Sequence, residues 1–332
     1  MNKFIKVLLA IMAIAVAGVV LAFAPSFIKG VGDGYNQAHK QHNKDSEKPN
    51  ETLAEVYSPA IWKVEHGQKV SYLFGSIHLG DDSMYPLPQH IMDAYQTTDY
   101  LAVEADIENI DQMQLAKLMQ ELAPNSGTPL EQMLSEKTLE RYKNYCQEEK
   151  LACQNFQYFD PWYVSFNFMA RELAKSGLDT EAGIDKYFLK LAKNNKPILS
   201  LESLELQMRM FESFSIELQD ALLLGAMDLN KESDNSADAD IIRAWKTGNV
   251  EQFVDSYLES QAGEGFSEDT YQEFLDKALV VRNKNMADKL DTLFKEGKSI
   301  FSVVGAAHYA GDDGIHNLLK NKGYTVTRLK EK

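Results

Sequence analysis

The chain has 332 residues, of which 44% are hydrophobic and 25% charged, and its formal net charge at pH 7 is -15. This length suits one large domain or two tightly joined lobes. The acidic balance argues against nucleic acid as a partner, because nucleic-acid binding depends on lysine and arginine side chains that neutralise phosphates.

The N-terminus carries an almost uninterrupted apolar stretch from Val7 to Ala24, preceded by Lys3 and Lys6. A stretch of this length is at the short end of the roughly 17 to 25 residues that span a bilayer. A secretory signal also fits such a segment. We therefore expect residues 1–27 to be an inner-membrane anchor or a cleaved signal. Either would place the rest of the chain in the cell envelope, as a periplasmic or extracellular domain or as a protein released into the periplasm.

The next segment, residues 28–54, is polar and lacks apolar periodicity, which is typical of a flexible linker. We expect a single domain over residues 55–332 to follow it. Cys146 and Cys153 are the two cysteines of the chain. Two neighbouring cysteines in an oxidising compartment can form a disulfide, and the alternative is a pair of free thiols in a helical region.

Strand patterns occur near both ends of the domain, and helical patterns fill its middle. The predicted strands cover residues 60–65, 70–75, 100–104, 197–201, 299–304 and 324–329. The predicted helical regions cover residues 86–95, 110–150, 159–176, 185–193, 203–295 and 313–321. The first two strands are predicted to form a hairpin, and the closing segments a compact βαβ unit. The predicted fold is thus α/β (α+β), with a central sheet built from strands of both chain ends and a mostly helical middle region.

Two segments 230 positions apart are nearly alike. They are YLFGSIHLG at residues 72–80 and SVVGAAHYAG at residues 302–311. In each, an apolar run ends at a glycine, Gly75 or Gly305, and a histidine, His78 or His308, follows three residues later. An apolar run that ends in glycine is typical of a buried strand followed by a sharp turn. Because α/β proteins bind ligands outside the carboxyl ends of their strands, we expect both histidines in one crevice.

Two carboxylates, Glu104 and Glu202, also follow predicted strands. Imidazoles and carboxylates together suit a divalent metal ion such as Mn, Co or Zn, and such a metal can activate water for hydrolysis. We therefore predict His78, His308 and Glu104 as metal ligands, with Glu104 and Glu202 as catalytic residues acting as ligand or general base. The structural alternative is ordinary turn histidines and buried ion pairs.

Four residues are predicted to contact substrate: Gly75, Ser76, Gly305 and Arg282. A glycine lets the backbone approach a ligand closely because it has no Cβ. Arg282 would clamp a substrate carboxylate, and its alternative is an ordinary surface role. Asp185 is either a helix cap or a supporting partner of the site. His316 lies on a helical stretch, where we expect it to be exposed.

The chain resembles the TraB/GumN family, which includes PrgY and the Tiki proteins, over about residues 54–330. The resemblance rests on the GSIH and GAAH motifs, YLAVEAD, GIDKYFLKLAKNNKPILSLES, RNKNMA at Arg282, and VGAAHYAGDDGIHNLLKNKGYTVTRL. It implies metal-dependent peptidase activity outside the cell that requires the two motif histidines, here His78 and His308, and an acidic residue, here Glu104. Glu202 matches the family's middle Leu-Glu segment, and Tyr309 stands where a leucine is expected. The broader fold also resembles haem-binding ChaN-like and erythromycin-esterase-like proteins, so the scaffold is not tied to peptide cleavage.

Three hypotheses follow. The first is an exported metal-dependent hydrolase, of the peptidase type, that acts on a peptide or small-molecule substrate. The second is a non-catalytic envelope protein that binds or sequesters a peptide or haem in the same crevice. The third is a purely structural envelope protein, in which substitution of either histidine would have no effect.

Overall fold

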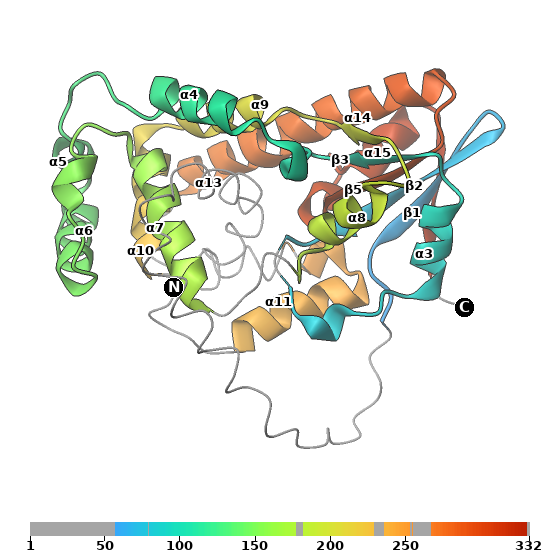
Figure 1. Cartoon of the computed structure of the whole chain (residues 1–332), viewed down its shortest axis with the longest axis horizontal. Helices are drawn as coiled ribbons and strands as arrows, with labels where there is room; N and C mark the ends of the chain where they lie inside the picture. Colours follow the sequence, from blue (N-terminus) through green and yellow to red (C-terminus); the bar gives the residue numbers. More distant parts are fainter. Residues whose placement is uncertain are drawn as a thin grey trace, which may run out of the picture.

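The computed structural model describes residues 57–78, 80–176, 182–228, 236–252, 254 and 267–330 (Figure 1). The predicted anchor or signal at residues 1–27 and the predicted linker at residues 28–54 lie outside these ranges. Within the described ranges, no helix combines the length and apolar character needed to cross a membrane.

A six-stranded sheet in the order β4-β3-β5-β2-β1-β6 forms the centre of the molecule. The strands are β1 (Ile61–His66), β2 (Lys69–Ser76), β3 (Tyr100–Val103), β4 (Ile198–Ser200), β5 (Ile300–Gly305) and β6 (Thr325–Leu329). Strands β4, β3, β5 and β2 run parallel, and β1 is antiparallel to both β2 and β6. The predicted sheet is confirmed: β2 from the start of the domain pairs directly with β5 from its end.

The turns and connections follow from the local sequence. The predicted hairpin is formed by β1 and β2, and Gly67 in its turn has a φ of +58°, a conformation that L side chains rarely adopt. The closing unit differs from a compact βαβ unit. Strand β6 runs in the same direction as β5, but β2 and β1 lie between them.

The helices surround the sheet and extend into a separate helical part (Figure 1). They are α3 (Gln89–Gln96), α4 (Gln112–Leu122), α5 (Leu130–Met133), α6 (Glu136–Glu148), α7 (Pro161–Ser176), α8 (Ile184–Ala192), α9 (Leu204–Glu212), α10 (Ile216–Asp228), α11 (Ser236–Thr247), α13 (Glu268–Leu275), α14 (Val281–Lys295) and α15 (Ile315–Asn321). Short 3-10 turns are η1 (Asp82–Met84), η2 (Ile107–Asn109), η3 (Cys153–Phe156) and η7 (Ala306–Tyr309), and η6 (Asp276–Val280) is a π-helical turn.

Both faces of the sheet are covered by helices. Successive side chains of a strand point to opposite faces, so each strand contributes to the packing on both sides. Phe301 of β5 packs against Phe188 of α8 with ring centroids 5.0 Å apart. Ile300 and Val304 of the same strand belong to a second apolar cluster, which they share with Leu290 of α14 and residues of α15. Figure 1 shows α8 and the α14–α15 pair on either side of the strands. The continuous apolar run of β5 is therefore explained by burial on both sides.

The helical middle packs around α7 and α10. Trp162, Phe166 and Met169 of α7 are almost fully buried and belong to the main apolar core. The Cys146–Cys153 disulfide joins α6 to η3, and no described cysteine is free, so the predicted pairing is confirmed. The expectation of an exposed His316 is wrong, because its ring stacks on Trp62 at a centroid distance of 4.7 Å.

Candidate functional site

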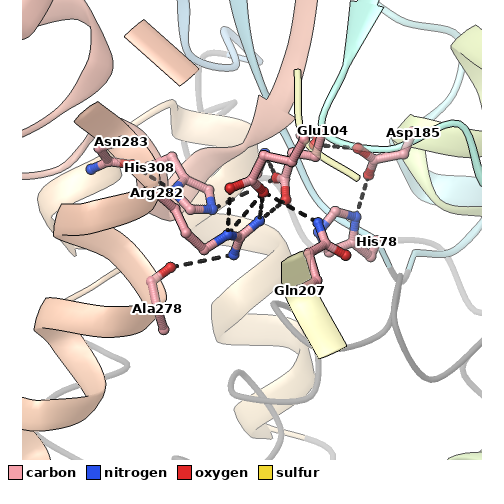
Figure 2. A network of polar contacts seen from close by, with 11 residues as sticks. His78, Glu104, Asp185, Gln207, Ala278, Arg282, Asn283 and His308 are labelled. Carbon is pink, nitrogen blue, oxygen red and sulfur yellow. Dashed lines mark hydrogen bonds and ion pairs between the residues drawn. The ribbon is translucent and has the colours of Figure 1, made fainter. Parts of the chain in front are cut away.

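The carboxyl ends of the four parallel strands meet at one edge of the sheet. His78 follows β2, Glu104 follows β3, Glu202 follows β4 and His308 lies in η7 after β5. The adjacent strand ends are in register, since Ser76 pairs with Gly305. The backbone N–H of Glu202 also donates to the carbonyl of Glu104 at 2.8 Å. The structure thus brings together the two histidines and two carboxylates that the sequence singled out. Figure 2 shows His78, Glu104 and His308 around Arg282.

His308 is buried in a fixed orientation. Its Nδ1 lies 2.6 Å from Oδ1 of Asn283, an acceptor, so Nδ1 carries the hydrogen and Nε2 presents a lone pair. Nε2 is buried without a hydrogen-bond partner and lies 3.7 Å from Oε1 of Glu104. Burial is the main reason why the pKa of His308 falls to about 3, so its imidazole is neutral at physiological pH. The result is an unused lone pair directed into the site.

His78 is held by a carboxylate on the other side of the site. Its Nδ1 lies 2.5 Å from Oδ2 of Asp185, and Oδ1 of the same carboxylate accepts a hydrogen bond from the Ser76 hydroxyl at 2.8 Å. Burial is the largest single influence and would lower the pKa of His78, but the charge and hydrogen bond of Asp185, with the charge of Glu104, together outweigh it and the pKa is raised. Asp185, at the start of α8, therefore orients His78, which is the supporting role that the sequence left open.

Arg282 joins the two carboxylates. Its Nη2 lies 2.6 Å from Oε2 of Glu104 and 2.6 Å from Oε2 of Glu202, and its Nε donates to Glu202 at 2.9 Å. All three side chains are almost fully buried. Burial by itself would raise the pKa of Glu104. Its interactions with His308, Arg282 and His78, together with the Gly305 N–H, outweigh burial and lower that pKa to about 2. Glu104 is therefore an anion throughout the physiological pH range.

Gly305 leaves open a space shared by these groups. A Cβ built on Gly305 would lie 3.2 Å from Oε1 of Glu104, 3.6 Å from Cδ2 of His308 and 3.6 Å from Nε2 of His78. The backbone N–H of Gly305 donates to the same Glu104 oxygen at 2.8 Å. Glycine at this position keeps the backbone close to the carboxylate and keeps side-chain atoms out of the centre of the site.

The donor chemistry of the site fits a divalent metal ion. The unpartnered Nε2 of His308, the Nε2 of His78 and the anionic Glu104 border one small space. Metal-binding histidines typically direct their other ring nitrogen to a carboxylate or another hydrogen-bonding group, as Asp185 and Asn283 provide here. Within the described ranges, no group of three or more histidine, cysteine, aspartate or glutamate side chains is arranged so that it could hold a metal ion. In this arrangement Glu104 is paired with Arg282.

The residues predicted to contact substrate have contacts within the protein. The N–H of Gly75 donates to the carbonyl of Ala60, and its carbonyl accepts from Trp245. A Cβ on Gly75 would lie 3.3 Å from Ala60 and Ala306 atoms. The hydroxyl of Ser76 holds Asp185, and Arg282 holds the two glutamates. Contact of these residues or of Gly305 with substrate stays a prediction.

Sequence reasoning missed two members of the site. Asn283 orients His308, and the side-chain amide of Gln207 donates to Oε2 of Glu202 at 3.3 Å. Asn283 directly follows Arg282 in the RNKNMA segment, which was the available signal. Gln207 lies in the first turns of α9, whose N-cap Ser203 immediately follows Glu202. Both contacts depend on how α9 and α14 pack, which no local pattern reveals.

Most of the chain matches a known protein family. The model of the TraB/PrgY/gumN family matches residues 60–328. "Uncharacterized protein YbaP" of Shigella flexneri is 29% identical, covering 79% of this chain and 92% of its own, and its Escherichia coli K12 counterpart is 28% identical with the same coverage.

A "Metalloprotease TIKI homolog" of Nematostella vectensis is 21% identical, covering 82% of this chain and 68% of its own. No solved structure gives a significant match. The family match includes all four strand ends of the site. The chain therefore belongs to the TraB/PrgY/gumN family.

Proposed function

We propose that this protein is an exported metal-dependent hydrolase with a peptide as substrate. His78, His308 and Glu104 would hold a divalent metal ion, Mn, Co or Zn. The observation that carries the proposal is the buried, unpartnered Nε2 of His308, which faces an anionic Glu104. A buried nitrogen without a partner is costly, and a metal ion would satisfy it. The likeness to a metalloprotease homolog supports the choice of a peptide substrate.

A bound divalent metal would supply a water of lowered pKa, the nucleophile that hydrolysis needs. The chain's own residues prepare that chemistry. Asp185 and Asn283 fix the ring orientations of His78 and His308, and Arg282 keeps Glu104 anionic. A carboxylate with a pKa near 2 suits metal ligation better than proton transfer, because an efficient general base has a pKa near the working pH.

Glu202 was predicted to be catalytic, and its contacts support an indirect role. Its side chain is 1% exposed and is bound by Arg282 and Gln207. We assign Glu202 as a positioning residue that holds Arg282 against Glu104. Glu104 is then the carboxylate of the pair that reaches the space beside Gly305.

The proposed location is the cell envelope. Residues 1–27 would serve as an inner-membrane anchor or a cleaved signal, so the domain would face the periplasm or lie free within it. The Cys146–Cys153 disulfide supports export, because disulfides persist mainly in oxidising compartments.

The proposal is tested on the purified protein by metal analysis and by cleavage of a peptide library. Wild-type protein loaded with Mn, Co or Zn should retain one of these metals and cleave peptides, and a chelator should stop cleavage. His308→Ala should lose the metal but keep its fold, since it removes one imidazole. His316→Ala is the matched control, because His316 is half-buried outside the site.

Three results would count against the proposal. Equal metal retention by His308→Ala and wild type would contradict the proposed metal site, because His308 would then not be a ligand. Metal retention with tight peptide or haem binding but no turnover would favour the non-catalytic binding protein instead. If His78→Ala and His308→Ala both left metal and ligand binding unchanged, the purely structural hypothesis would be favoured.

A further inference from the structure

A pocket lies beside the site, between the segments that follow β3 and β4. Its volume is about 590 Å3, within the range of small-ligand pockets. It is lined by residues 105–121, which begin directly after Glu104, and by residues 200–205, which include Glu202. The N–H of Asp106 donates to the Ser200 hydroxyl at 3.2 Å, so the two segments are tied together next to the site.

The pocket is lined by both apolar and acidic side chains. Ile107, Leu115 and Leu204 are among its apolar lining residues. Besides Glu202, which is paired with Arg282, four carboxylates line the pocket, and Lys117 is the one cation among the described lining residues. The four are Asp106, Asp111, Glu121 and Glu205. Arg209 bridges Glu121 of α4 and Glu205 of α9 at 2.8 Å and 3.0 Å. Even with Arg209 counted, the carboxylates around the pocket outnumber the cations.

This combination matches one kind of side chain. Lysine and arginine lay their methylene stems along apolar surface while their charged ends stay among polar groups. An acidic apolar cavity would favour such a side chain over a neutral one of equal length and would oppose an acidic one. The net charge of -15 would also attract a cationic peptide over longer range.

We propose that this α4–α9 pocket, lined by residues 105–121 and 200–205, binds a lysine or arginine side chain of a peptide substrate. This proposal rests on the proposed peptidase function, because the bound peptide is a substrate only if the protein cleaves it. The pocket lining includes Glu202 and begins one residue after Glu104, so a peptide seated there would lie next to the carboxylate side of the site. A basic residue near the cleaved bond is the expected specificity.

The test measures binding separately from cleavage. The probes are three fluorescein-labelled alanine-rich octapeptides that differ at one central position, which holds lysine, norleucine or glutamate. Wild-type protein should bind the lysine peptide about three- to tenfold more tightly than the norleucine peptide, since each exposed charge contact contributes little. The glutamate peptide should bind most weakly.

Two variants locate the effect. The Glu121→Gln/Glu205→Gln double variant should lose most of the lysine preference, whereas the matched control Glu136→Gln/Glu140→Gln, on exposed positions of α6, should keep it. Gln114→Trp places a bulky ring in the pocket lining from an exposed position of α4 and should weaken binding of all three peptides.

The outcomes separate this proposal from the proposed function. Equal binding of lysine and norleucine peptides, or a lysine preference that survives in the Glu121/Glu205 double variant, would overturn the pocket assignment even if peptides are cleaved. A lysine preference that depends on Glu121 and Glu205 without any cleavage would uphold the pocket and overturn the peptidase.

Discussion

Single side chains decide how the two histidines present themselves. Asp185 and Asn283 each hold the Nδ1 of one ring, which directs both Nε2 atoms toward the space at Gly305. The two holders differ in charge. Asp185 raises the pKa of His78, whereas the neutral amide of Asn283 leaves burial to lower that of His308. The pKa values of the two imidazoles are therefore shifted in opposite directions.

Asp185→Asn should weaken metal binding by about 10- to 100-fold, because the carboxylate fixes His78 and raises its basicity as a ligand. A competition titration with Zn or Mn measures the affinity. Asp220→Asn is the control, since Asp220 of α10 also accepts hydrogen bonds, from Ser135 and Thr138 at the start of α6, away from the site. Equal loss of affinity in both variants would mean that Asp185 acts through folding alone.

His316 should make the protein less stable in acid. Burial, together with nearby Lys320 and Arg328, lowers its folded-state pKa to about 4, below its ordinary value of 6.5. The unfolded chain therefore takes up the proton first, and stability present above pH 6.5 is lost as the pH falls toward 4. Because the ring is only partly buried, we expect a loss of about 1–2 kcal/mol.

Urea unfolding between pH 7 and pH 4 tests this expectation for wild type and His316→Phe. The variant should lose about 1–2 kcal/mol less than wild type over this interval, because phenylalanine keeps the stacking on Trp62 without a titrating group. His42→Phe, in the predicted linker, should behave like wild type. Parallel pH curves for wild type and His316→Phe would contradict the assignment.

At the scale of elements, α14 connects the strand ends. Its first turn follows the π-helical turn η6, and the consecutive residues Arg282 and Asn283 both reach the site. Arg282 contacts the carboxylates after β3 and β4, and Asn283 contacts the histidine after β5. Single π-helical turns are frequent at functional sites. Three strand ends therefore depend on one helix N-terminus for their arrangement.

Arg282→Gln should reduce the free energy of unfolding by about 3–5 kcal/mol at pH 8, because it leaves two buried carboxylates without a cation. One carboxylate pKa would then rise above the unfolded value. Stability should therefore be greater at pH 5 than at pH 8. Urea unfolding at both pH values measures the effect. Arg209→Gln is the control, because it removes exposed ion pairs and should lower the free energy of unfolding by less than about 1 kcal/mol. An equally small loss for Arg282→Gln would refute the role given to its buried contacts with Glu104 and Glu202.

The strand ends could be predicted from the sequence because each follows a short apolar run, and parallel strands place their ends at one edge. His78, Glu104, Glu202 and His308 therefore meet as expected. The partners of these residues could not be predicted in the same way. Whether Arg282 meets a substrate or two glutamates depends on how α14 packs on the sheet, and the contact of Gln207 depends on α9. The position of β6 beyond β1 likewise depends on pairing between distant segments.

At the scale of the whole molecule, the sheet with its covering helices and the α6–α7–α10 helical part share one continuous apolar core. The disulfide lies in the helical part, where it links α6 to η3. The site depends on the strand ends at the sheet, so stability of the helical part and metal binding at the sheet should respond to different changes.

Cys146→Ser/Cys153→Ser should lower the free energy of unfolding by about 2 kcal/mol, since a short closed loop removes limited entropy from the unfolded chain. Urea unfolding of the variant and of wild type under non-reducing conditions measures this loss. Wild-type protein with its disulfide reduced is a second reference. Metal affinity should not change. An unchanged unfolding free energy, or a loss of metal binding at unchanged stability, would contradict this division.

The pairing of β2 with β5 has a consequence for the newly made chain. Ribosomes complete His78 long before His308, and β5 must insert between β2 and β3 before both rings can share a space. A nascent or truncated polypeptide that stops before position 300 therefore carries His78 and Glu104 but lacks His308, and the centre is not assembled. Late synthesis of one strand would keep the proposed hydrolase inactive until the chain is nearly complete.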